Sequence, residues 1–105
     1  MTIYDERERA AERQYVLMAE KPFRIRARRD KMLASWVATL LGRDIARCLE
    51  DIIEADFARG DEGVLKKLES DLAILGLSDT RNLIRHKMQK CFADAVRDVE
   101  GSVNQ

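Results

Sequence analysis

The side chains whose types and spacing could support chemistry in this chain gather in two charged segments. Residues 21–31 carry six basic side chains against one acid, Asp30, and residues 50–63 carry six acids against one base, Arg59. A basic run is typical of phosphate or nucleic-acid binding, and clustered carboxylates are typical of a divalent-cation site. The opposed charges of the two segments can also steer association with a charged partner.

Neither segment has the other features that such a site needs. On a helix the basic side chains spread around much of the circumference, no aromatic stacking platform accompanies them, and the chain has no net charge. We therefore expect no nucleic-acid partner. The acids lack a dense oxygen-ligand loop, so we expect a solvated face and no metal site. The basic side chains are Arg24, Arg26, Arg28, Arg29 and Lys31, and the clustered acids are Asp51, Glu54, Asp56, Asp61 and Glu62.

Nucleophiles and acid–base groups are equally sparse. His86 is the single histidine and lies between Arg85 and Lys87, which disfavour a second positive charge, so we expect it to face solvent or to pack. Cys48 and Cys91 fall on apolar helical stripes and are expected to be buried, reduced side chains. With no nucleophile–base pair, Gly-rich phosphate loop or metal-ligand spacing, the sequence predicts a protein that is not an enzyme and needs no cofactor.

The elements that position these groups all have the helical period. Apolar stripes with spacings of three and four residues predict four helices, which Asp44, Asp61 and Ser78 begin and Gly42, Gly60, Gly76 and Gly101 end. Short connections predict that these helices pack as an all-α, four-helix bundle over residues 22–105. The stripes are Ile25, Met32, Leu33, Trp36, Val37, Leu40 and Leu41; Ile45, Cys48, Leu49, Ile52, Ile53 and Phe57; Val64, Leu65, Leu68, Leu72 and Leu75; and Leu83, Ile84, Met88, Cys91, Phe92, Ala95, Val96 and Val99.

The first 21 residues differ from this body and are predicted to form an N-terminal arm. Tyr4, Ala11, Tyr15 and Met18 share one helical face, which is too little apolar surface to be held by a core. An isolated helix of this length is marginal in water, so we expect the arm to be mobile when free and helical when docked. Pro22 is expected to begin the first helix of the body and thus to separate the arm from it.

No segment resembles a signal peptide or a membrane span, because charges begin at residue 5 and no long apolar run follows. The sequence therefore predicts a cytoplasmic protein without direct membrane insertion, and we expect the free chain to be monomeric.

Four blocks of residues, in order and in register, resemble the ATPase inhibitor zeta-subunit family of alphaproteobacteria, formerly a domain of unknown function. They are Asp5-Glu-Arg-Glu-Arg-Ala10; Ala27-Arg-Arg-Asp-Lys-Met-Leu33 with Trp36 and Leu41-Gly42; Ala55-Asp-Phe57 with Gly60-Asp-Glu62; and Asp71-Leu72 with Ser78-Asp79 and Ile84-Arg-His-Lys-Met88.

The resemblance implies a four-helix bundle whose mobile N-terminal region inserts, as a helix, between catalytic and rotor subunits of the F1-ATPase and blocks ATP hydrolysis. Carried over, residues from about 2 to 17 would form the inhibitory segment of an ATP synthase regulator that binds at the cytoplasmic face of the inner membrane. Its expected contacts to F1 are Tyr4, Arg7, Arg9, Arg13 and Tyr15.

Three positions depart from the family's pattern. Ala11 stands where a bulky aromatic is usual, Pro22 where helix-friendly residues are usual, and Asp30 where Asn is usual. The first two departures favour a weak inhibitor. The alternatives are therefore a helical adaptor that binds another partner through residues 21–31, and a ligand-binding bundle, each with weak or no ATPase inhibition.

Overall fold

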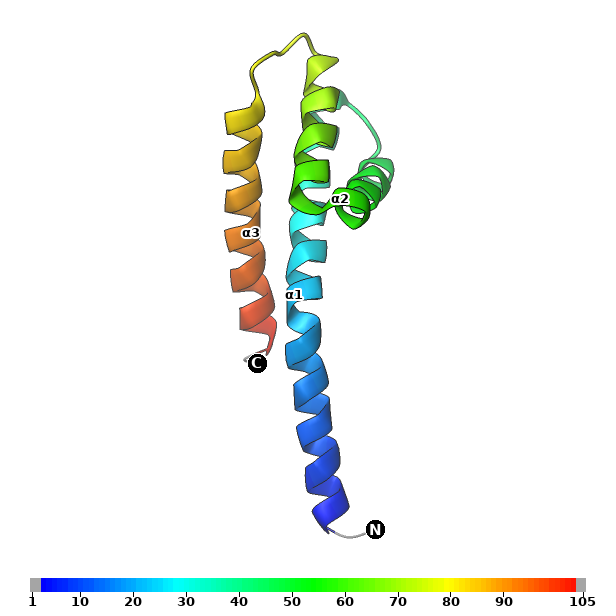
Figure 1. Ribbon diagram of the computed structural model, residues 1–105, viewed down its shortest axis with the longest axis vertical. Helices are drawn as coiled ribbons and strands as arrows, with labels where there is room; N and C mark the ends of the chain where they lie inside the picture. The colour runs from blue at the N-terminus through cyan, green and yellow to red at the C-terminus, as the bar shows by residue number, and fades with distance from the viewer. Residues whose placement is uncertain (1–2, 104–105) are drawn as a thin grey trace.

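The computed structural model contains three helices (Figure 1). It describes the backbone of residues 3–103 and the side chains of residues 20–101. Helix α1 spans Ile3–Leu41, α2 spans Ile45–Ala73 and α3 spans Arg81–Val103. The predicted all-α class is confirmed, because the described backbone has no strand. The predicted number of four helices is wrong.

The count differs because two of the predicted helices are the two halves of α2. Arg59 and Gly60 have non-helical dihedral angles inside α2, with φ −142° and ψ 16° for Arg59 and φ 61° and ψ −146° for Gly60. The glycine thus produces a kink, after which the helix resumes at once without a loop. Figure 1 shows the first half of α2 nearly end-on and the second half alongside α3.

Pro22 lies inside α1, so the prediction that it begins a helix is wrong. A proline within a helix removes one N–H donor and crowds the carbonyl four residues earlier, at a cost of about 3 kcal/mol. Pro22 is exposed, and at an exposed position a carbonyl without its N–H partner can accept a hydrogen bond from water. The boundary between an arm and the body at residue 22 remains a prediction.

Several predicted helix ends are confirmed by their local geometry. Asp44 caps α2, and its carboxylate accepts a hydrogen bond from the backbone N–H of Arg47 at 3.3 Å. Gly42, directly after α1, has a φ of +65°, which glycine adopts without a steric penalty. The start of α3 differs: Asp79 has a φ of +59°, and the helix begins at Arg81 rather than near Ser78.

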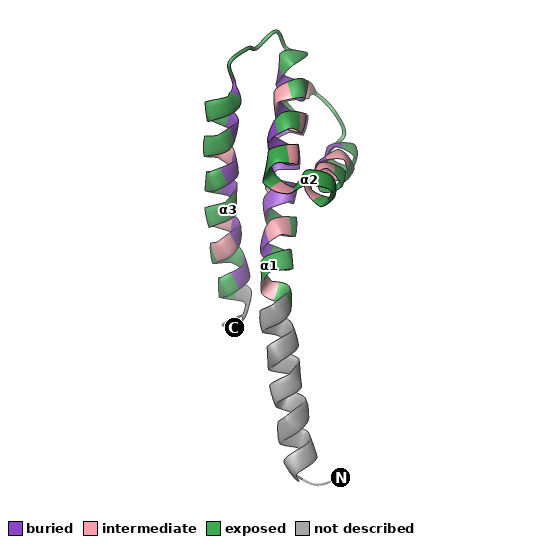
Figure 2. Cartoon of the chain, viewed as in Figure 1, coloured by how far each residue is buried: buried purple, intermediate pink, exposed green. Residues whose placement is uncertain are grey.

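The hydrophobic core lies between α1 and the two other helices, which contact each other less than they contact α1. Figure 2 shows the buried residues on the facing sides of the helices. Cys48 and Cys91 are both free and buried, as predicted, and burial raises the pKa of each thiol. The largest fully buried apolar side chains are Leu33, Val37, Ile52, Val64, Leu68, Leu72 and Ile84.

Part of each predicted apolar stripe lies at the surface, contrary to the expectation that the stripes are buried. Each helix turns only part of its circumference toward its neighbours, so the outer edge of a broad stripe is left exposed. The exposed members are Leu40, Ile45, Ile53, Phe57, Leu75, Leu83 and Phe92.

The kink at Gly60 gives a first testable prediction. Its combination of positive φ and strongly negative ψ is essentially restricted to glycine, so Gly60→Ala is expected to destabilise the fold by about 1–3 kcal/mol. Gly101→Ala is the matched control, because an added Cβ there meets no atom within 4 Å and alanine favours a helix. Urea denaturation followed by circular dichroism measures both. Equal stability of the two variants would contradict a requirement for glycine at the kink.

Candidate functional site

The expected contacts of the inhibitory arm, Tyr4, Arg7, Arg9, Arg13 and Tyr15, lie outside the residues whose side chains the structure describes. The expectation that the arm is mobile when free falls on the same residues. What the structure does describe is how the body that carries this arm is held together, and which surfaces it presents.

The two charged segments meet where α1 crosses the kink of α2. We call this group the junction cluster; it consists of Arg26, Arg29, Asp30, Asp56 and Asp61. Arg29 is central and is only 2% exposed. Its guanidinium donates to Asp30 Oδ1 from Nε at 3.1 Å and from Nη2 at 2.9 Å. Its Nη1 donates to Asp61, and its Nη2 lies 3.5 Å from Asp56 Oδ2.

Arg26 completes the junction cluster from the solvent side. Its guanidinium donates to Asp56 and, through Nη2, to Asp61 Oδ1 at 3.0 Å. Two cations therefore face three carboxylates. Asp56 precedes the kink and Asp61 follows it, so these ion pairs bind both sides of the kink to α1. The expectation that the acids of residues 50–63 form a solvated face is wrong for Asp56, which is half-buried and pairs with Arg26 and Arg29.

The junction cluster has one carboxylate more than it has cations, and this surplus favours a bound proton. Burial raises the pKa of Asp30 to about 7, and a hydrogen bond shared with Asp56 raises it as well. Burial would also raise the pKa of Asp56, but hydrogen bonds from Arg26 and Asp30 outweigh it and the pKa of Asp56 is lowered. We infer that Asp30 is the member of this pair that holds the proton near neutral pH.

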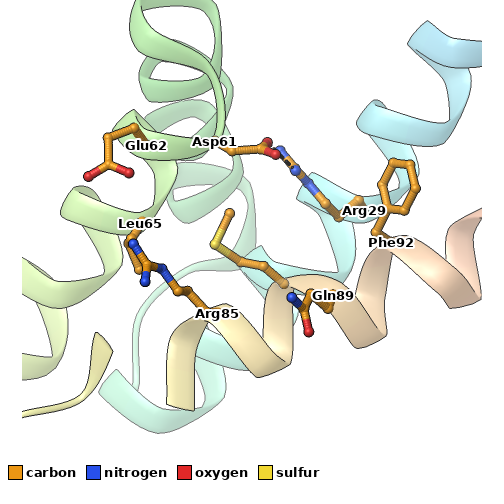
Figure 3. A pocket seen from close by; sticks show the side chains of 8 residues that line it. Arg29, Asp61, Glu62, Leu65, Arg85, Gln89 and Phe92 are labelled. Atoms are coloured by element: carbon orange, nitrogen blue, oxygen red, sulfur yellow. Dashed lines mark hydrogen bonds and ion pairs between the residues drawn. The ribbon is translucent and has the colours of Figure 1, made fainter. Parts of the chain in front are cut away.

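A groove of about 400 Å³ opens beside the junction cluster (Figure 3). Arg29 and Asp61 form one wall, and Arg85 and Gln89 of α3 project from the other. The donors of Arg29 are already directed at carboxylates, so little of its charge is available to a ligand. The groove is lined by Arg29, Asp61, Glu62, Leu65, Arg85, Met88, Gln89 and Phe92, which include no nucleophile–base pair.

The other predicted candidates lie at the surface. His86 is exposed, in agreement with a solvent-facing histidine. In the basic segment, Arg28 pairs with Asp98 at 3.1 Å and Lys21 with Glu100 at 3.3 Å, so part of its charge is used to hold α1 against α3. Among the described residues, no group of three or more His, Cys, Asp or Glu side chains is placed to hold a metal ion.

The opposed charges of residues 21–31 and 50–63 are evident in the sequence, but the contact between the two segments was not predicted. The two segments carry nearly equal and opposite charge, and this was the available signal. Helices that carry opposite charges attract each other, which favours placing them side by side. A helical pattern alone does not give the side of α1 on which the kink of α2 falls.

Fold and site together define a small helical protein in which buried and half-buried ion pairs fasten α1 to α2 and further pairs hold α1 against α3. The chain belongs to the family described as ATPase inhibitor subunit zeta, whose family model matches residues 1–98. The resemblance seen in four sequence blocks is thereby confirmed. No curated protein and no solved structure matches the chain significantly.

Membership of this family supports a role as an ATPase inhibitor and implies an association with ATP synthase. It also favours a regulatory, non-catalytic protein. Separately, no helix in the described part of the chain is long and apolar enough to cross a bilayer.

Proposed function

We propose that this chain inhibits ATP hydrolysis by the F1 sector of ATP synthase, and that it does so by inserting residues from about 2 to 17 as a helix between catalytic and rotor subunits. The observation that carries the proposal is the family match, which covers residues 1–98 and so includes this segment together with the body. A helix wedged at that interface stops the rotor and with it hydrolysis. The place of action is the cytoplasmic face of the inner membrane, where F1 stands.

The body supports this role as an anchor. Residues 23–41 of α1 form one wall of the core, and the junction cluster fastens α1 to α2 through the buried Arg29. In this proposal the body holds the base of the arm in place while the arm lies against the rotor. Contacts made by the arm only when it is docked also offset the cost of ordering it, about 2–5 kcal/mol for coupled folding and binding.

The alternative of an adaptor that binds through residues 21–31 has weaker support. Arg26 and Arg29 belong to the junction cluster, and Arg28 and Lys21 pair with α3. Most of the basic side chains in this segment therefore have structural partners in the protein.

Arginines of the arm are expected to contribute strongly to inhibition. We expect the double substitution Arg9→Ala and Arg13→Ala to raise the half-inhibitory concentration for ATP hydrolysis by about 100-fold, since each interface arginine commonly contributes about 1–2 kcal/mol. The half-inhibitory concentration is measured by titrating purified F1-ATPase with each variant and recording the rate of ATP hydrolysis. Arg85→Ala, at an exposed position on α3, is the control and should inhibit like the parent chain. Unchanged inhibition by the double variant would argue against arm contacts through these arginines.

A further inference from the structure

The first half of α2, residues 45–58, exposes an apolar stripe that no other described element covers. Phe57 is 94% exposed and Ile53 is 48% exposed, while Cys48 and Ile52 of the same segment are buried in the core. Spacings of four residues place Leu49, Ile53 and Phe57 along one line of the helix. Leu49 is half-buried at the edge of the core. We call Ile53 and Phe57 the α2 stripe.

Two acids border the α2 stripe on its outer side. Glu50 and Glu54 are exposed, lie four residues apart and form no ion pair with any other described side chain. Like charges at this spacing destabilise a helix. The contrast with the inward-facing Asp56 is marked, because Asp56 is neutralised by Arg26 and Arg29. An apolar surface bordered by unpaired acids is complementary to an apolar surface bordered by lysine or arginine.

The fold also places the α2 stripe near the base of the arm. The kink at Gly60 turns the first half of α2 out of line with its second half and away from α3 (Figure 1). The contact between Arg26 and Asp56 fixes the end of the stripe, next to Phe57, against α1. The predicted arm ends at residue 21, and Arg26 lies five helical residues, about 7.5 Å, further along α1.

We propose that the α2 stripe is a second docking surface, which binds an apolar, basic-bordered patch on the F1 sector when the arm is inserted. The inference rests on the proposed function, since it names a further contact in the same complex. The arm then provides the block, and the stripe holds the body against the outside of F1. The two contacts in one chain increase the overall affinity, because the second forms at high effective concentration.

The test uses the full chain, with Ile53→Ala and Phe57→Ala combined in one variant and Glu50→Gln and Glu54→Gln combined in another. Alanine favours a helix, and all four side chains are exposed, so both variants are expected to fold, which thermal melting verifies. Leu83→Ala is the control, because Leu83 is a similarly exposed apolar residue on α3. Binding to immobilised F1 is measured at two salt concentrations.

We expect the alanine variant to raise the dissociation constant by about 10- to 100-fold, mainly through faster dissociation. The glutamine variant should associate more slowly and lose part of its salt dependence. The control should bind like the parent chain.

Parent-like binding by both variants would overturn the inference. It would also be overturned if sedimentation showed that the parent chain self-associates and the alanine variant does not, while both bind F1 equally. Reduced binding by the arm variant with unchanged binding by the stripe variants would leave the proposed function standing without the inference. Absence of binding by the parent chain would contradict both the proposed function and the inference about the α2 stripe.

Discussion

Replacement of Arg29 by alanine is expected to lower the free energy of unfolding by about 3–5 kcal/mol, because removal of one partner leaves buried charge uncompensated. Arg29 is 2% exposed and contacts Asp30, Asp56 and Asp61. Without it, Asp30 and Asp56 lose a cation in a place that water reaches poorly. The loss should be larger at pH 8 than at pH 5, since protonation of Asp30 relieves part of the excess negative charge.

Urea denaturation of the full chain measures this loss. Arg85→Ala is the matched control, because Arg85 is exposed and the change removes the same side chain. We expect the control to change stability by less than about 0.5 kcal/mol, as is usual for surface substitutions. Arg29→Lys should recover only part of the stability, since an ammonium group lacks the planar fork that reaches Asp30 and Asp61 together. Similar losses for Arg29→Ala and Arg85→Ala would contradict a structural role for the junction cluster.

The second large effect concerns pH. The pKa of Asp30 is about 7 in the fold against an ordinary value of 3.8. Between these values the folded chain keeps a proton that the unfolded chain has released. Stability is therefore expected to fall as pH rises from about 4 to 7, by an amount on the order of a few kcal/mol, and to level off above the folded pKa. The lowered pKa of Asp56 has the opposite effect: it makes the free energy of unfolding fall as pH falls, and only below about pH 4.

Asp30→Asn should remove this pH dependence and stabilise the protein at pH 8. An asparagine oxygen can accept from Arg29 while its amide donates to Asp56, which are the two roles of a protonated Asp30. Asn is also the residue that the family resemblance leads us to expect at this position. We infer that aspartate substitutes for asparagine at this position by holding a proton.

Thermal melting between pH 5 and pH 8 measures the difference between the two proteins. Asp79→Asn is the control, because Asp79 is exposed and has a φ of +59°, a conformation that asparagine tolerates. Parallel stability curves for the parent chain and Asp30→Asn would show that another group carries the pH dependence.

Local signals in the sequence predicted much of the fold. Asp44 was identified as a cap and Gly60 as a break, because both effects act through the backbone of their own neighbours. The period of the apolar residues gave the helical class and the buried positions Leu33, Ile52 and Ile84. The cap and the break depend on interactions within a few residues along the chain, and the period of the apolar residues depends on the geometry of a single helix.

What the sequence did not predict depends on packing between distant segments. A helix continues through Pro22 although the local cost favours a break. Phe57 belongs to a regular apolar stripe, yet it lies on the side of α2 away from the buried Cys48 and Ile52 and is 94% exposed. Arg29 and Asp61 look like surface charges in the sequence and meet only when α1 crosses α2. Gly60 allows a kink, but the direction that α2 takes after it depends on how both halves pack in the core.

ATP hydrolysis by F1-ATPase, titrated with the full chain and with a chain that begins at residue 20, tests the central claim most directly. The account predicts that the full chain inhibits and that the shortened chain, shown by its melting transition to be folded, does not inhibit at a 100-fold higher concentration. Equal inhibition by the two chains would contradict the claim that the arm blocks the enzyme, and would assign inhibition to the body.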